Sequence, residues 1–245
     1  MKASAFEFRF RLWISFVIIV LGFWAPWIEP MQWGTRTTTW LCLGFHISAL
    51  GVTATTGIVI ATWLTIAVAA VAALLRVCGT AYLGAGIVND AEMKAGLVIA
   101  DGPYRYLRNP LYLGSWLMAA AIATLMPPTG ATVCMVLLSV FLIRIVLAEE
   151  AYLTTQLGEP YTAYKRAVPR LLPGLGREVA AGYRHPNWGR ALLSEITPIG
   201  VLVSFAALSW DYNSNLLIRA IIVSFGLSLI VKALLPAGDS NSSLH

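Results

Sequence analysis

The sequence predicts an all-α fold, a polytopic membrane helical bundle with about seven transmembrane helices. Of its 245 residues, 58% are hydrophobic and 12% charged, and the mean hydropathy is +0.73, which excludes an ordinary soluble domain. Apolar runs long enough to cross a bilayer recur along the chain. The net charge of +5 comes from basic residues in the loops between these runs, so nucleic acid is not an expected partner.

The first two apolar regions predict three helices. Residues 12–28 follow three basic residues, carry three tryptophans and lack a small-x-small cleavage site, so we expect a retained span and not a cleaved signal. Residues 37–75 carry no charged residue, and as one helix they would measure about 58 Å, roughly twice the hydrocarbon thickness. The chain is therefore expected to fold back near residues 51–57.

The remaining apolar runs predict four more helices. A polar segment, 76–110, precedes a helical hairpin of residues 111–126 and 130–148, which Pro127, Pro128, Thr129 and Gly130 would turn. A basic and aromatic segment, 149–190, leads to two spans at about 191–210 and 216–235. We divide the chain into N-terminal helices (1–75), a central core (76–175), and C-terminal helices with a tail (176–245).

Basic residues predict the orientation of the chain in the membrane. Placing the two polar segments on one side gathers ten basic residues there, and that side should be cytoplasmic, in a bacterial inner membrane. Lys2, Arg9 and Arg11 favour the opposite side for the N-terminus, so either the larger bias prevails or the early helices are miscounted by one. The ten residues are Arg76, Lys94, Arg105, Arg108, Lys165, Arg166, Arg170, Arg177, Arg184 and Arg190.

Cysteine spacing predicts no metal centre. Cys42, Cys78 and Cys134 lie far apart, in or beside apolar runs, and no Cys/His ligand spacing occurs. They are expected to be small buried apolar residues.

Arg105 and Arg108 lie directly before an apolar run. Such a cluster is often a juxtamembrane anchor to lipid head groups, but a guanidinium fork also fits a carboxylate. Asn109 and Pro110 are favoured at the N-cap and first position of a helix, so they predict a helix start near Leu111.

Glu149 and Glu150 follow the hairpin. Carboxylates at a helix C-terminus oppose the macrodipole and lose hydration near a bilayer, which leaves two interpretations, a solvated face of a continuing helix or a binding site. Gly158 predicts the end of that helix. Tyr161 and Tyr164 would share a face of the next helix, and such a pair alone is typical of an interfacial aromatic belt.

Together these residues resemble the catalytic region of the isoprenylcysteine carboxyl methyltransferase and phospholipid methyltransferase family, integral membrane enzymes that use S-adenosylmethionine. The resemblance covers about residues 76–173. It implies methyl transfer from S-adenosylmethionine to a membrane-resident lipophilic acceptor, a carboxylate or amine of a lipid or isoprenoid-like molecule. Its elements are Gly102, Pro103, Tyr104, Arg105, Arg108, Asn109, Pro110, Tyr112, Gly114, Glu149, Glu150, Leu153, Gly158, Tyr161, Tyr164, Val168, Pro169 and Arg170.

The resemblance also implies site residues. Asn109 stands where many members have histidine, and it cannot become cationic. Ala167 stands where prenylcysteine enzymes carry a basic residue, which argues against assuming prenylcysteine as the acceptor. The implied catalytic residues are Glu149, Glu150 and Arg170, and the implied cofactor-binding residues are Arg105, Arg108, Asn109, Tyr112, Gly114, Glu149, Glu150, Tyr161 and Tyr164.

Two other functions remain open at this point. Residues 184–189 resemble the Arg-His-Pro-Asn-Tyr motif of membrane sterol reductases, a related fold that binds NADPH, although a repeated helix-start signal is the simpler and favoured interpretation. A non-catalytic membrane protein is the other alternative. The sequence does not assign partners to Arg144, inside an apolar run, or to Glu195.

Overall fold

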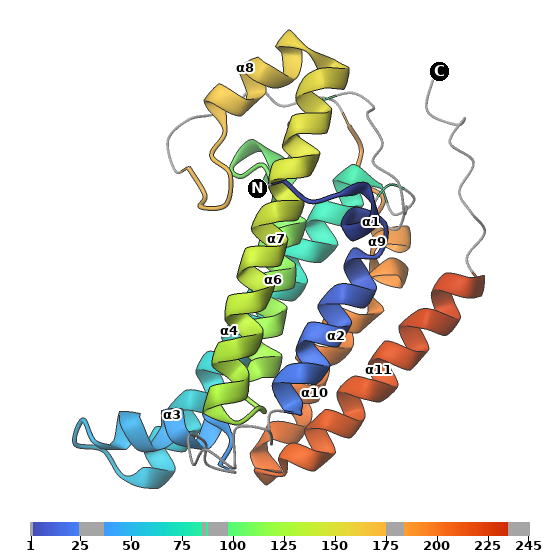
Figure 1. Cartoon of the computed structure of the whole chain (residues 1–245). Coiled ribbons are helices and arrows are strands. Elements are labelled where there is room, and N and C mark those ends of the chain that lie inside the picture. The colour runs from blue at the N-terminus through green and yellow to red at the C-terminus, as the bar shows by residue number, and fades with distance from the viewer. Residues whose placement is uncertain (1, 25–36, 85–86, 88–97, 175–183, 235–245) are drawn as a thin grey trace.

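The computed structural model describes residues 2–24, 37–84, 87, 98–174 and 184–234, and every regular element within them is helical (Figure 1). The predicted all-α class is confirmed. In chain order the elements are α1 (Ala5–Arg9), α2 (Arg11–Phe23), α3 (Thr39–Ser48), α4 (Ala54–Leu83), the 3₁₀ turn η2 (Gly102–Arg105), α6 (Pro110–Ala123), α7 (Pro128–Leu157), α8 (Glu159–Ala167), α9 (Trp188–Ser194), α10 (Ile196–Leu208), the 3₁₀ turn η3 (Ser209–Asp211) and α11 (Ser214–Leu234).

Three helices of the described chain, α4, α7 and α11, are long and apolar enough to cross a membrane. A fourth span exists if α9 and α10, bent by 70° at their junction, count as one. Helices α2 and α6 are apolar but shorter. The predicted total of about seven spans is therefore not confirmed. The ends of the predicted first and last spans, 25–28 and 235, lie outside the described residues.

The predicted reversal near residues 51–57 is confirmed, but α3 is too short to span. Thr38 and Thr53 cap α3 and α4, each accepting a hydrogen bond from a backbone N–H three residues ahead. The two helices cross where Gly57 meets Gly44, since a Cβ on Gly57 would lie 2.2 Å from the Gly44 carbonyl oxygen. With ten residues, α3 measures about 15 Å, half of a bilayer core.

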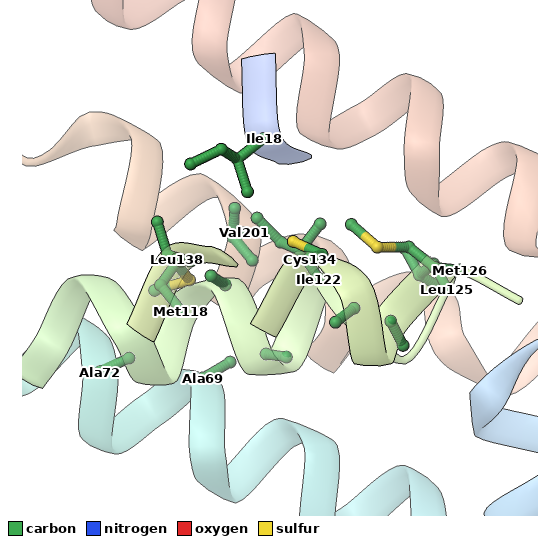
Figure 2. Close-up of a cluster of buried hydrophobic side chains, with 14 of the residues drawn as sticks. Ile18, Ala69, Ala72, Met118, Ile122, Leu125, Met126, Cys134, Leu138 and Val201 are labelled. Carbon is green, nitrogen blue, oxygen red and sulfur yellow. The ribbon is translucent and has the colours of Figure 1, made fainter. Parts of the chain in front are cut away.

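Helices α4, α6 and α7 form the centre of the bundle. In Figure 2, Ala69 and Ala72 of α4 lie beneath α6, from which Met118 and Ile122 extend into the apolar cluster. Cys134 of α7 is fully buried in that cluster, as expected for a small apolar residue. Small side chains at such crossings let membrane helices approach closely, which fixes α6 against α4.

The predicted hairpin is confirmed, with wider bounds for its second helix. The apolar run predicted this helix over residues 130–148, whereas α7 begins at Pro128 and continues to Leu157, past the end of the apolar run. Glu149 and Glu150 therefore lie inside a helix. Glu150 is 3% exposed, so the interpretation of this pair as a solvated face is wrong for that residue. Gly158, with φ of 61°, ends α7 as predicted.

The prediction that Arg76 begins a polar loop is wrong. Helix α4 continues to Leu83 and carries Arg76 within it, because an ion pair with Glu195 compensates its charge at an N–O distance of 2.6 Å. Arg76 therefore does not belong among the loop residues that set orientation, and Lys94 and Arg177 lie outside the described residues. Arg144 meets a carboxylate, that of Glu7 in α1, at 2.8 Å.

The polar elements gather at one end of the bundle. Helix α8, the turn η2 and the N-terminal end of α6 lie together at the top of Figure 1, where α7 also ends. The α3–α4 reversal lies at the opposite end. Residues predicted as one site, although separated by some forty positions in sequence, thus share one end of the protein.

Candidate active site

The centre of the site is the carboxylate of Glu150, which two arginines and an amide surround. Arg170 Nε lies 3.1 Å from both carboxylate oxygens, and Arg170 Nη2 lies 2.9 Å from Oε2. Arg108 Nη1 lies 3.1 Å from Oε1, and Asn109 Nδ2 donates to the same oxygen at 3.2 Å. Two positive charges therefore face one buried negative charge.

Arg108 keeps unused hydrogen-bonding capacity. Its side chain is 9% exposed, and within the described part of the chain its Nε and Nη1 are buried without a hydrogen-bond partner. The Nη1 contact with Glu150 is an ion pair without hydrogen-bond geometry. Buried guanidinium donors normally find partners, so the cluster is suited to receive an anionic group.

Backbone hydrogen bonds hold the segment after α8 against the start of α6. Arg108 N donates to the carbonyl of Pro169 at 2.9 Å, and Asn109 Nδ2 donates to the carbonyl of Arg170 at 3.2 Å. Asn109 is the N-cap residue of α6 and Pro110 its first residue, as predicted, but the Asn109 side chain makes no capping bond. Its amide is committed to Glu150 and Arg170 instead.

Glu149 has a different partner from its neighbour. Tyr112 Oη donates a hydrogen bond to Glu149 Oε2 at 2.6 Å, joining α6 to α7. Successive residues of a helix point about 100° apart, so Glu149 and Glu150 cannot serve the same group. Glu150 holds the arginine cluster, and Glu149 presents a carboxylate whose Oε1 takes no part in the tyrosine bond.

Gly114, which the resemblance implied to be a cofactor-binding residue, lies at a close helix crossing where Arg76 of α4 approaches its backbone. A Cβ on Gly114 would lie 2.7 Å from Arg76 Cγ and 3.1 Å from the Ala72 carbonyl oxygen. Beyond this crossing, Arg76 Nη1 donates to Ser115 Oγ at 2.6 Å. The absence of a side chain at residue 114 therefore lets an arginine of α4 cross α6.

Arg76 belongs to a second polar network that sequence analysis missed. Glu195, 1% exposed, accepts hydrogen bonds from Arg76 Nε and Nη2 at 2.6 and 3.0 Å, and from Thr80 Oγ1 at 2.6 Å. Glu195 stands at the bend between α9 and α10. This network joins the C-terminal helices to α4, and no local spacing could have indicated a pair so far apart in sequence.

Tyr161 and Tyr164 form a buried pair with centroids 5.9 Å apart, so an exposed aromatic belt does not describe them. Tyr164 Oη donates to the Tyr104 carbonyl at 2.8 Å. Burial raises the pKa of both phenols above their ordinary value, and the nearby Glu150 raises the pKa of Tyr161 further. Both hydroxyls are therefore neutral at physiological pH.

Arg105 and the motif at residues 184–189 were also singled out by the sequence. Arg105 is the last residue of η2 and is half-buried. The motif at 184–189 starts a helix, as its simpler interpretation predicted. Asn187 accepts a hydrogen bond from Arg190 N at 3.1 Å and caps α9, while its own N–H donates to the Ala81 carbonyl at 2.9 Å.

The apolar spans and the buried arginine–carboxylate cluster define a helical membrane protein with a polar site at one end of its bundle. Residues 52–159 match the phospholipid methyltransferase family. The match covers less than half of the chain, and it confirms the predicted resemblance over that segment. The segment includes Arg108, Tyr112, Glu149 and Glu150, and it ends before Arg170.

A curated relative also supports a resemblance to methyltransferases. The Protein-S-isoprenylcysteine O-methyltransferase of Schizosaccharomyces pombe is 33% identical over 88 residues, which cover 36% of this chain and 37% of the relative. The chain thus matches just over a third of that relative's length. No solved structure matches the chain. These likenesses favour a methyltransferase over a membrane reductase.

Proposed function

We propose that this chain is an integral membrane methyltransferase that transfers a methyl group from S-adenosylmethionine to a lipophilic acceptor resident in the membrane. The observation that carries the proposal is the Glu150 cluster, in which residues from both halves of the predicted motif meet on one buried carboxylate. The family of the matched segment supports the reaction type.

The residues present fit S-adenosylmethionine. Its methionine carboxylate needs a cationic fork, and Arg108 offers buried donors without partners in the described chain. Its amino group or ribose hydroxyls need an acceptor, for which we assign Glu149 Oε1. Arg170 stays charged because its hydrogen bond to Glu150 raises its pKa, and it balances the carboxylate that orients Arg108. Arg105, Asn109, Tyr112, Gly114, Tyr161 and Tyr164 complete the proposed cofactor-binding set.

When bound, S-adenosylmethionine supplies a methyl group already activated by a sulfonium. The protein's task is then to align the nucleophile and exclude water. A carboxylate acceptor needs no general base. An amine acceptor must lose a proton, and Glu149 is better suited than Glu150 as the base, because both oxygens of Glu150 are occupied by Arg170.

The acceptor is proposed to enter laterally from the bilayer. The cluster lies where α6 begins and α7 leaves the apolar core, next to the basic residues Lys165, Arg166 and Arg170. These charges favour an anionic head group or a carboxylate. The same charges support placing this end of the protein at the cytoplasmic face, where S-adenosylmethionine is made.

Two measurements on the purified protein in detergent test this proposal. Calorimetric titration should detect binding of S-adenosylhomocysteine and none of NADPH; the reverse result would support the reductase instead. Incubation with methyl-labelled S-adenosylmethionine and a total membrane lipid extract should place label in the lipid fraction. Label confined to water-soluble metabolites would refute lateral entry.

A further inference from the structure

The hydroxyl of Tyr104 is buried and makes no hydrogen bond to any described residue. Tyr104 is 7% exposed, and its Oη has no hydrogen-bond partner among the residues that the structure describes. A buried hydroxyl normally has a partner, because leaving it unpaired loses the hydration that water would supply. An unpaired donor in a folded protein therefore needs an explanation.

The position of Tyr104 is fixed by its backbone. Its N–H donates to the Asp101 carbonyl at 3.1 Å, and its carbonyl accepts the hydrogen bond from Tyr164 Oη at 2.8 Å. The ring of Tyr104 extends toward α4, where a Cβ on Gly79 would lie 3.5 Å from Oη. The hydroxyl is thus held in place by contacts that do not use it.

That position lies beside the Arg76–Glu195 network. Gly79 directly precedes Thr80, whose hydroxyl donates to Glu195, so Tyr104 Oη approaches α4 next to this network. Four residues further along the chain, Arg108 contacts Glu150. Tyr104 thus belongs to the segment that runs from the contact with α4 to the arginine cluster.

The electrostatic surroundings keep this hydroxyl protonated. Burial raises the pKa of Tyr104 well above its ordinary value, and Glu149, Tyr164 and Glu195 raise it further, while Arg76 opposes them. A phenol with a raised pKa is neutral at physiological pH and carries a proton to donate. The group that this donor suits is an oxygen with a free lone pair.

We propose that Tyr104 Oη donates a hydrogen bond to an oxygen of a bound substrate, a carboxylate, hydroxyl or phosphate oxygen of either the methyl donor or the methyl acceptor. Tyr104 is then a binding residue of this site, a role that the resemblance did not imply for it. This inference rests on the proposed function. It explains why, among the residues that the structure describes, a donor is left unpaired at a buried position beside α4.

The Tyr104→Phe variant tests the inference, because it removes the hydroxyl and keeps the ring. The ligand-free variant should unfold in detergent at the same temperature as the wild type or higher, since no hydrogen bond is lost. Tyr164→Phe is the matched control: it removes a buried hydroxyl that does have a partner, so its unfolding temperature should fall.

Ligand measurements then identify the source of the oxygen. If the oxygen belongs to the methyl donor, Tyr104→Phe should bind S-adenosylhomocysteine about two- to tenfold more weakly. If it belongs to the acceptor, S-adenosylhomocysteine affinity should be retained, and the half-saturating concentration of the lipid extract should rise by a similar factor. Either result supports the inference.

Three results would overturn it. Unchanged affinity together with unchanged methyl-transfer kinetics shows that no ligand uses the hydroxyl. A fall in unfolding temperature matching that of Tyr164→Phe shows that the hydroxyl is already paired in the free protein. If the wild type binds no S-adenosylhomocysteine, the proposed function fails and this inference fails with it.

Discussion

Arg170 donates hydrogen bonds to the carboxylate of Glu150, although it lies outside the segment that matches the phospholipid methyltransferase family. Its Nε and Nη2 reach both carboxylate oxygens at 2.9 to 3.1 Å, although residue 170 lies after the segment's end at residue 159. The turn that follows α8 is therefore part of the site, and it carries one of the two cations that neutralise Glu150.

Removing the charge of Glu150 should weaken binding of S-adenosylhomocysteine. In Glu150→Gln the two arginines lose their shared partner, which should cost about 1.5–3 kcal/mol, roughly ten- to a hundredfold in affinity. Calorimetric titration in detergent measures the change. Glu159→Gln is the control, because its side chain is 74% exposed and its ion pair with Arg166, at 3.5 Å, is equally exposed. Equal affinities for wild type and Glu150→Gln would remove Glu150 from the site.

Arg108→Ala should produce a similar loss, ten- to a hundredfold, because it deletes the proposed fork for the methionine carboxylate. Arg108→Lys should recover only part of the affinity, since lysine keeps the charge but not the paired donors. Arg166→Ala, at an exposed position in α8, should leave affinity unchanged. An Arg108→Lys variant with full affinity would show that charge alone matters, and an Arg108→Ala variant with full affinity would exclude the residue.

Tyr112 and Glu149 should act as one unit. Tyr112→Phe removes a 2.6 Å hydrogen bond that orients Glu149, so it should lower methyl-transfer rate, and Glu149→Gln should lower it more. If Tyr112 acts through Glu149, the double variant should be no slower than Glu149→Gln alone. Methyl-transfer rates measured with labelled S-adenosylmethionine for the wild type, the two single variants and the double variant test this. Multiplicative losses in the double variant would mean that Tyr112 contacts the ligand independently.

Gly114→Ala should destabilise the protein by about 1–3 kcal/mol, because the added methyl group would overlap Arg76 Cγ and press on the Ala72 carbonyl. Gly189→Ala in α9 is the matched control: its Cβ would meet nothing within 4 Å, so stability should change by less than about 0.5 kcal/mol. Denaturant unfolding in detergent compares the two. Equal stabilities would contradict the close crossing of α4 and α6.

Replacing one member of the Arg76–Glu195 ion pair should lower the stability of the protein more than replacing both. Glu195→Gln leaves the Arg76 cation without its counter-charge, at a cost of about 3–5 kcal/mol. The double variant Arg76→Met with Glu195→Leu removes both charges and should recover most of that loss. Denaturant unfolding midpoints measure the stability of the variants. A double variant as unstable as Glu195→Gln would show that the unpaired charge does not cause the loss of stability.

Local patterns predicted some helix ends but not the helix that carries Arg76. Pro110 begins α6 and Gly158 ends α7, as predicted, because the conformational preferences of these residues act within a few positions. Arg76 was assigned to a loop because a charge usually ends an apolar run, and the charge that retains it in α4 belongs to Glu195, over a hundred residues away. Long-range pairing of this kind leaves no local pattern.

The hydrogen-bond partners of individual side chains could not be predicted from the residues next to them in sequence. Asn109 was expected to cap α6 with its side chain, but the amide serves Glu150, which is 41 positions away. The resemblance implied that Tyr112 binds the cofactor, and it gave no indication that the Tyr112 hydroxyl donates to Glu149. Tyr104 is part of the predicted motif, but no binding role was implied for it, because only the packed structure reveals that its hydroxyl has no hydrogen-bond partner among the described residues.

The length of α7 has a consequence for the membrane in which the protein works. Glu149 lies 21 residues after Pro128, about 32 Å along the axis, close to the thickness of a hydrocarbon core. The length of this helix therefore determines how deep Glu149 and Glu150 lie relative to the boundary between hydrocarbon and water. In bilayers of longer acyl chains they would be drawn into hydrocarbon, so turnover in reconstituted vesicles should peak at one chain length and fall on either side.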